Sequence, residues 1–237
     1  MPVVTIDGQM GSGGREIGLI VASILGTDCF DQAILEQAAQ RLGATVQAVE
    51  EKHARPARVR DRVVRFLTNF LERSAAAGSA GDPFLGPTGI EELLSRSYPE
   101  AAKPPITRGQ ELEDKRFLEV HRAVLRDLAS TGNAVIIGRG GVVELHDWPG
   151  ALHVYTVAPL EQRIRRVMQR LEMDRATAEK HTHETETARL AYFRKYFKVD
   201  AGDPLLYHLV LNTAQHPPDF LAQVIVEASR AIQPAAK

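Results

Sequence analysis

The chain has 237 residues, 44% of them hydrophobic and 25% charged, which is typical of a globular protein with one sizeable core. Its 29 basic and 30 acidic side chains give a net charge of −1, so no overall positive field favours binding to nucleic acid or to a membrane surface. The single cysteine, Cys29, excludes an internal disulfide and a cysteine metal cluster.

The N-terminal 43 residues read as strand, glycine loop, helix, short extended segment and helix. The apolar, β-branched run "VVTID" at 3–7 predicts a buried strand that ends at Gly8. From Arg15 the apolar residues recur at helical spacing, and the predicted helix ends at Gly26. The segment "DCFDQAILEQAAQRLG" follows, with its helix closed by Gly43.

Residues 44–109 predict a helical insertion with flexible joints. A basic amphipathic helix with an apolar stripe at 63–71 comes first, then a loop dense in glycine and proline, a short helix at 89–97 and the connection "PEAAKPPITRG". The basic run "HARPARVRDRVVR" could touch nucleic acid, but its aspartate and apolar stripe favour a solvated helix face. We therefore expect no nucleic-acid partner.

Regular alternation returns from residue 110 to the end. A long amphipathic helix from 110 is followed by the strand "NAVIIGRGG", the strand "ALHVYTVA", two helices over 160–171 and 175–197, the strand "YHLVLNT" and a closing helix. Strands that alternate with helices predict a doubly wound parallel sheet. The fold class is therefore α/β, with a core of residues 1–43 and 110–237.

The glycine loop after the first strand is the strongest local signal of function. At this position the helix N-terminus presents N–H groups and the positive end of its dipole, and glycines let the backbone approach an anion. The residues concerned are Gly8, Gly11, Ser12, Gly13, Gly14, Arg15 and Glu16. In the phosphate-loop motif G-x-x-x-x-G-K-[ST], Gly14 occupies the lysine position and Arg15 the hydroxyl position. A tight turn that binds nothing is the alternative interpretation.

Four motifs together resemble the cytidylate kinase-like family, a group of phosphate-loop relatives of cytidylate kinase. They are "GSGGREIG" near the N-terminus, "FD" at 30 and 31, "VIIGRGG" at 135–141 and "LVLNT" at 209–213. The resemblance implies a P-loop NTPase-type three-layer sandwich with a parallel sheet, a lid at about 160–200 and an acceptor-binding role for the 44–109 insertion. It also implies use of ATP and Mg²⁺, and a nucleoside monophosphate as partner.

The same resemblance assigns roles to individual arginines and to one aspartate. Arg139 stands where cytidylate kinases have the arginine of "EGRD", although Gly140 replaces the aspartate. Arg165 and Arg166 match the paired arginines of the lid, and Glu186 with Arg189 matches an acidic-x-x-Arg pattern. Asp31 resembles the aspartate of the acceptor site.

Phosphoryl transfer needs positive charge around the transferring group, and arginine holds phosphate oxygens in a bidentate manner. We expect this chemistry from Arg15, Arg139, Arg166, Arg189 and Arg194, and acceptor binding from Asp31, Arg139 and Arg165. A solvated face of the lid helix is the alternative for the lid arginines, and a helix N-cap is the alternative for Asp31. Asp7 and Asp31 are the candidates for contact with magnesium.

The sequence thus predicts a cytoplasmic nucleotide kinase that transfers the γ-phosphoryl group of ATP to a nucleoside monophosphate such as CMP. Two alternatives stay open: a non-catalytic nucleotide- or phosphate-binding sensor, and a kinase of another small molecule. We expect neither a signal peptide nor a membrane span, and a dimer is left open. His181 and His183 lie two apart on a predicted helix, so they do not suggest a metal site.

Overall fold

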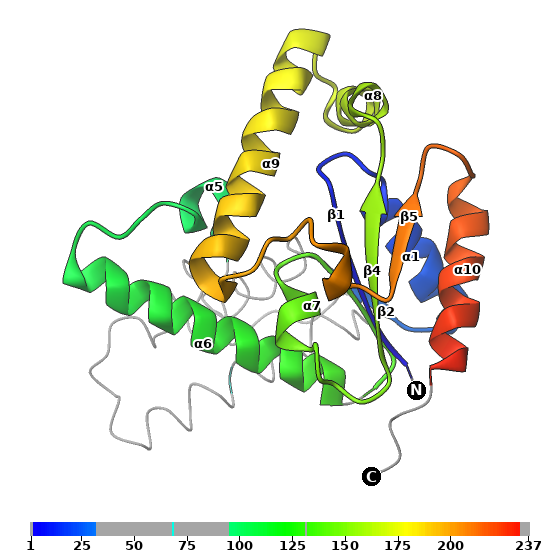
Figure 1. The fold of residues 1–237 in the computed structure, drawn as a ribbon, viewed down its shortest axis with the longest axis horizontal. Coiled ribbons are helices and arrows are strands. Elements are labelled where there is room, and N and C mark those ends of the chain that lie inside the picture. The colour runs from blue at the N-terminus through cyan, green and yellow to red at the C-terminus, as the bar shows by residue number, and fades with distance from the viewer. Residues whose placement is uncertain (1, 32–67, 69–94, 131, 233–237) are drawn as a thin grey trace, which may run out of the picture. The chain divides into compact units, whose positions relative to one another are not determined.

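The computed structural model describes residues 2–31, 68, 95–130 and 132–232, and Figure 1 shows the fold. The chain divides into two compact units: unit 1 contains residues 1–29, 98–103 and 131–237, and unit 2 contains residues 30–97 and 104–130. Most of the insertion predicted at 44–109 lies outside the described residues, so its acceptor-binding role stays a prediction.

The described chain alternates strands and helices as the sequence predicts. In order, its elements are β1 (Val3–Gly8), α1 (Gly14–Leu25), β2 (Asp28–Phe30), α5 (Tyr98–Ala101), α6 (Arg108–Ser130), β3 (Ala134–Ile137), α7 (Gly141–Glu144), β4 (Ala151–Val157), α8 (Leu160–Leu171), α9 (Arg175–Phe197), the 3-10 helix η3 (Pro204–Leu206), β5 (Leu209–Asn212) and α10 (Pro218–Ala231).

The strands form a five-stranded parallel sheet in the order β2-β3-β1-β4-β5. Strand β1 lies at its centre, with Ile6 opposite Ile137 of β3 and Val154 of β4. A central strand that is covered on both faces must be apolar on both, which explains the continuous apolar run of β1. The predicted α/β fold with a parallel sheet is confirmed.

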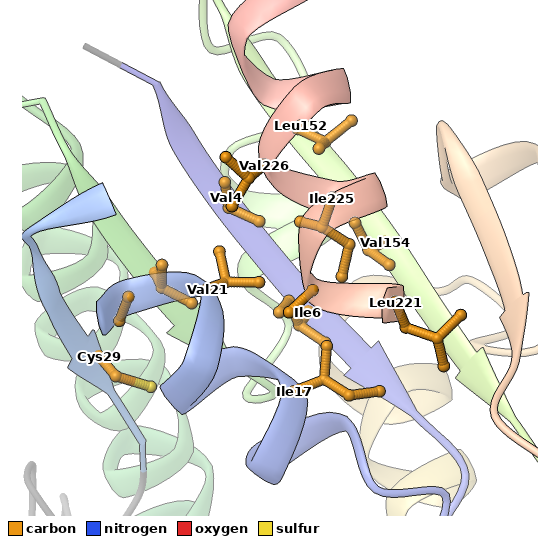
Figure 2. Close-up of a cluster of buried hydrophobic side chains, with 13 residues drawn as sticks. Val4, Ile6, Ile17, Val21, Cys29, Leu152, Val154, Leu221, Ile225 and Val226 are labelled. Atoms are coloured by element: carbon orange, nitrogen blue, oxygen red, sulfur yellow. The ribbon is translucent and has the colours of Figure 1, made fainter. Parts of the chain in front are cut away.

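One face of the sheet carries the main hydrophobic core of unit 1. Helices α1 and α10 pack together on this face, and Figure 2 shows their side chains against those of the strands. Val4 and Ile6 of β1 meet Val21 of α1 and Ile225 of α10, each at most 1% exposed. Burial of such side chains stabilises the fold by about 1.5–3 kcal/mol each, and it fixes the carboxyl end of β1 relative to α1.

The opposite face of the same strands is polar. Because side chains alternate along a strand, Thr5 and Asp7 of β1 and His153 and Tyr155 of β4 share this second face. All four are buried. Helix α7 packs against β1, which gives unit 1 its third layer. Buried polar side chains need partners, and these are described below.

Three short elements were not predicted. Helix α5 falls in a segment interpreted as a flexible connection, α7 in a segment interpreted as a glycine turn, and η3 in a segment left without structure. Each spans at most four residues, too few for a periodic pattern. Within the described ranges, no helix is both long and apolar enough to cross a membrane.

Candidate phosphate-binding site

The glycine loop runs from the end of β1 to the start of α1, as predicted. Gly11 and Gly13 have φ angles of 82° and 88°, and Gly13 is the N-cap of α1. The first hydrogen bond of the helical ladder runs from the Ile17 N–H to the Gly13 carbonyl. The backbone N–H groups of the first helical turn come before this first bond of the helix. In other proteins these are the N–H groups with which a helix N-terminus binds an anion.

The Thr156 side chain of β4 lies close to the backbone at both ends of this loop. A Cβ added to Gly8 would lie 2.0 Å from Thr156 Oγ1, and one added to Gly14 would lie 2.8 Å from the same atom. The fully buried Thr156 hydroxyl donates to the Asp7 carbonyl at 3.2 Å and accepts from the Ser12 hydroxyl at 2.8 Å. Only glycine fits at these two positions without displacing the threonine.

Arg166 of α8 also contacts the loop, through hydrogen bonds from its guanidinium. Its Nη1 donates to the Ser12 carbonyl at 2.9 Å and to Thr213 Oγ1 at 2.8 Å, and its Nη2 donates to the Thr213 carbonyl at 2.8 Å. The Thr213 hydroxyl donates to the same Ser12 carbonyl at 2.6 Å. A Cβ on Gly13 would lie 3.4 Å from Arg166 Nη1. A guanidinium thus lies beside the loop that lacks its lysine.

The other arginines of α8 divide between two faces. Arg163 donates from Nη1 to the Met10 carbonyl at 3.3 Å and from Nε to the Ala158 carbonyl at 3.1 Å. Arg170 is exposed, and partial desolvation together with the positive charge of Arg15 lowers its pKa. The spacing of residues 163, 166 and 170 gives one helical stripe. Arg165 lies off this stripe and is exposed.

The buried side chains of Asp7 and Arg189 and the partly buried Glu186 form a hydrogen-bonded network next to the loop. Arg189 of α9 donates to Asp7 Oδ1 at 3.1 Å, to Glu186 Oε1 at 2.9 Å and to the Tyr155 hydroxyl at 3.1 Å. Glu186 Oε2 accepts the Met10 N–H at 2.8 Å, and Asp7 Oδ1 accepts the Gly8 N–H at 2.7 Å. The residues that match the family's acidic-x-x-Arg pattern are therefore bound to the glycine loop.

Burial and the neighbouring charges act in opposite directions on the pKa values of Asp7 and Arg189. Burial raises the pKa of Asp7, although Arg189 and the Gly8 N–H both favour the carboxylate. Burial lowers the pKa of Arg189, but the charges of Asp7 and Glu186 outweigh it, so the net direction is upward. Among the residues described, Asp7 Oδ2 is buried without a hydrogen-bond partner.

Arg139 lies on the turn after β3, next to the end of β1. The Gly138 N–H donates to the Ile6 carbonyl at 2.9 Å, which brings this turn beside Asp7. The Arg139 side chain is buried, at 3% exposure for the residue, and its guanidinium carbon lies 5.3 Å from the centre of the Tyr98 ring. Within the described part of the chain, neither Nη1 nor Nη2 of Arg139 has a hydrogen-bond partner.

The remaining predicted residues are exposed or lie outside unit 1. Arg194 is largely exposed, with Nη2 at 3.9 Å from Asp200 Oδ2. Arg15 and Glu16 are exposed in the first turn of α1. Asp31 is buried and belongs to unit 2. The roles predicted for these residues stay predictions.

Several residues that build the site were missed by the sequence analysis: Thr156, Arg163, Thr213 and Tyr98. The available signal was positional, since Thr156 and Thr213 lie at the carboxyl ends of β4 and β5, where parallel sheets place their sites. Arg163 shares a helical stripe with Arg166. Tyr98 carried no signal, because nothing in the sequence links it to Arg139.

Three histidines gather on the polar face of the sheet, away from the loop. The rings of His146 and His208 stack on that of His153, with centroids 6.2 Å and 4.9 Å away. His153 Nδ1 lies 2.7 Å from Thr5 Oγ1, and the backbone N–H of His153 donates to His208 Nδ1 at 3.0 Å. Burial and the neighbouring His208 and His146 lower the pKa of His153 to about 4.

The described residues do not form a complete magnesium site by themselves. No group of three or more His, Cys, Asp or Glu side chains in the described ranges could hold a metal ion. Mg²⁺ in kinases is held by phosphates, waters and one or two carboxylates, and Asp7 Oδ2 is an oxygen of the required kind. The predicted contact of Asp7 with magnesium, directly or through water, therefore stays a prediction.

Comparison with known proteins identifies the family. The cytidylate kinase-like family matches residues 3–215. A cytidylate kinase of Aeropyrum pernix is 33% identical over 50% of this chain and 68% of its own. One of Halobacterium salinarum is 25% identical over 65% and 76%.

A solved structure, an uncharacterized protein of Eubacterium ventriosum, is similar with a TM-score of 0.57 at 15% identity, over 98% of this chain and 99% of that one. At this identity the likeness concerns the fold alone. Together with the glycine loop and the arginines around it, the family match over nearly the whole sequence leads to one conclusion. The chain belongs to the cytidylate kinase-like family.

Proposed function

We propose that this protein is a nucleotide kinase that transfers the γ-phosphoryl group of ATP to a nucleoside monophosphate such as CMP. The family and the names of the two relatives support a phosphotransferase. The observation that carries the proposal is the buried guanidinium of Arg139, whose terminal nitrogens lack hydrogen-bond partners among the described residues.

A buried positive charge without hydrogen bonds is costly, and a bound anion removes this cost. The planar fork of arginine matches the oxygens of a phosphate monoester. Arg139 follows β3 and the glycine loop follows β1, and these strands are neighbours in the sheet. Two phosphate groups bound at these two places would meet at one edge of the sheet. Arg139 is therefore assigned to the phosphate of the acceptor.

The donor's phosphates are assigned to the loop from Gly11 to Arg15 and the start of α1. The amides of the loop and the helix dipole favour polyphosphate. Arg166 supplies a positive charge beside Gly13, and Arg15 with Arg170 places two more near the start of α1. Each positive charge near the transferring phosphoryl group stabilises the negative charge that this group carries in the transition state.

The reaction needs no nucleophile from the protein. An oxygen of the acceptor's phosphate forms the new bond to the γ-phosphorus of ATP, the bond to the bridging oxygen of the β-phosphate breaks, and ADP leaves. The residues of this chain bind and orient the two substrates. Magnesium, when bound, neutralises charge on the donor phosphates, and Asp7 is the residue assigned to contact it.

A non-catalytic phosphate sensor is the second candidate, and specific contacts favour it. Gly14 stands in place of the lysine, Arg166 is bound to the Ser12 carbonyl, and Glu186 is bound to the Met10 N–H. These contacts fasten α8 and α9 to the loop. In a sensor, nucleotide would bind and no phosphoryl group would move.

A coupled assay that measures ADP release tests the proposal. Purified protein is supplied with ATP, Mg²⁺ and, in turn, CMP, UMP, dCMP, AMP and GMP. We expect turnover with a pyrimidine monophosphate and its loss in Arg139→Met. Arg230→Met is the matched control, since Arg230 is exposed and pairs only with Glu227 among the described residues. ATP binding without turnover on any of these acceptors would contradict the proposal and favour the sensor.

A further inference from the structure

Arg139 is held in an uncommon backbone conformation. Gly138, Arg139 and Gly140 have φ angles of 69°, 58° and 73°, all in the left-handed region. A residue with a side chain rarely adopts this conformation, because its Cβ approaches the following carbonyl oxygen. Such a conformation persists where surrounding contacts determine it. The contacts of this turn therefore decide where the Arg139 guanidinium lies.

Tyr98 of α5 makes two of these contacts. Its hydroxyl accepts the Arg139 N–H at 2.9 Å, and its ring faces the Arg139 guanidinium at 5.3 Å. A Cβ on Gly138 would lie 3.0 Å from the same hydroxyl. One side chain thus determines both the backbone and the charged end of Arg139.

Helix α9 fixes Tyr98 and the other end of the turn. The Tyr98 ring contacts the Tyr192 ring edge-on, with centroids 5.2 Å apart. Lys195 Nζ donates to the carbonyls of Ala101 and Lys103 at 2.9 Å and 2.6 Å, which closes the C-terminal end of α5. A Cβ on Gly140 would lie 2.3 Å from the Phe197 ring.

Helix α5 also begins at the residue where the chain passes from unit 2 into unit 1. Residues 98–103 belong to unit 1, whereas the chain on both sides of them belongs to unit 2. Tyr98 is therefore the first residue of unit 1 after the long segment from Phe30 to Ser97.

We propose that Tyr98 is a positioning residue for Arg139 and thereby sets the affinity for the acceptor's phosphate. The proposal rests on the proposed function, in which Arg139 binds that phosphate. Tyr98 does not touch the reacting atoms. Its hydroxyl holds the Arg139 backbone in the left-handed conformation, and its ring holds the guanidinium in the buried position where the phosphate is bound.

Tyr98→Phe tests this role with little change in packing. The substitution keeps the ring, its contact with Tyr192 and the cation–π contact, and it removes the acceptor of the Arg139 N–H. Tyr207→Phe is the matched control, because the Tyr207 hydroxyl also makes one buried hydrogen bond to backbone, to the Ala201 carbonyl at 2.8 Å. Both variants lose one tyrosine hydroxyl in unit 1.

The first measurement is hydrogen exchange of the Arg139 amide by NMR, which needs no ligand. We expect exchange at least about tenfold faster in Tyr98→Phe than in Tyr207→Phe, since the N–H loses its partner. The second is steady-state kinetics: the acceptor KM should rise about fivefold, roughly the effect of one hydrogen bond, while the ATP KM stays unchanged. Tyr98→Leu, which also removes the ring, should raise the acceptor KM further.

The outcomes separate this inference from the proposed function. Unchanged Arg139 exchange in Tyr98→Phe, or an acceptor KM equal to that of Tyr207→Phe in an active enzyme, overturns the positioning role and leaves the proposed function standing. If the wild-type protein phosphorylates no acceptor, the proposed function fails, and the acceptor role of Tyr98 fails with it. A parallel rise in both KM values would assign Tyr98 to general packing and would also overturn the inference.

Discussion

Arg189 Nη1 lies 3.1 Å from Asp7 Oδ1, although the two residues are 182 positions apart in the sequence. Both side chains are almost fully buried, at 4% and 5% exposure. This ion pair joins the end of the first strand to α9. Residues interpreted from the sequence as a lid and as a possible magnesium contact are thus bound to each other.

Removal of one partner of this pair should destabilise the fold strongly. We expect Arg189→Met to lower the free energy of unfolding by about 3–5 kcal/mol, because it leaves the Asp7 carboxylate buried without its counter-ion. Urea unfolding at pH 7 measures this. Arg230→Met, which breaks an exposed pair with Glu227, should cost less than about 1 kcal/mol. The double variant Asp7→Asn, Arg189→Met should recover part of the loss, and equal costs for the two single arginine variants would contradict the prediction.

The histidine stack predicts a loss of stability in acid. Burial and neighbouring histidines lower the pKa of His153 to about 4, below the ordinary 6.5, so the unfolded chain binds the proton more readily. The stability from this residue is complete above pH 6.5 and falls as the pH drops from 6.5 to about 4, by roughly 3 kcal/mol in total. Protonation of His208 Nδ1 would also remove the acceptor of the His153 N–H.

Urea unfolding at several pH values between 7.5 and 4 measures this slope. His153→Gln should flatten it between pH 6.5 and 4, whereas His181→Gln, in α9 and outside the stack, should leave it unchanged. A wild-type slope that survives in His153→Gln would assign the acid sensitivity to other groups.

Gly140→Ala should lower the free energy of unfolding by more than the replacement of a left-handed glycine normally does. Its Cβ would meet the Phe197 ring at 2.3 Å, so steric overlap adds to the backbone strain, and we expect about 3 kcal/mol in total. Gly26→Ala is the matched control, because Gly26 has φ 61° and a Cβ there would meet nothing within 4 Å. Its expected cost is about 1 kcal/mol. Thermal unfolding of both variants checks the difference, and similar melting temperatures would contradict it.

Arg166→Lys should weaken the binding of ATP more than that of the acceptor. Lysine keeps the charge but cannot make the bonds of Arg166 to the Ser12 carbonyl and Thr213 at once. We expect a rise of roughly tenfold in the ATP KM, with the acceptor KM within about twofold of wild type. Arg175→Lys, an exposed residue of α9 paired with Glu161, serves as the control. Equal changes in both KM values would argue against a donor-side role.

The sequence predicted the core of unit 1 well, for identifiable reasons. Strands β1 and β3 are short β-branched runs that end at or before a glycine, β4 is a longer apolar run with alternate polar residues, and helices α8 and α9 occupy the predicted ranges. The glycine loop was predictable because glycine spacing after a first strand has few structural explanations. The roles expected of the arginines at 139, 166 and 189 came mainly from the family resemblance, and they stay predictions.

The contacts that give these residues their environment were not predictable. Tyr98 meets Arg139 after a separation of 41 residues, through a four-residue helix without periodicity. The histidines at 146, 153 and 208 come together because β4 and β5 are parallel neighbours, and register cannot be read from a single strand. One signal was available and not used: Thr5, Asp7, His153 and Tyr155 are alternate polar residues in otherwise apolar strands, which indicates a polar face.

The tight approach of Thr156 to Gly14 limits how this loop could be redesigned. Any side chain at position 14 would meet the Thr156 hydroxyl at 2.8 Å from its Cβ, and that hydroxyl is bonded to Ser12 and to the Asp7 carbonyl. A smaller residue at position 156 would relieve the overlap with an introduced lysine, but it would remove both hydrogen bonds. A lysine at position 14 therefore has to be designed together with a compensating change in β4.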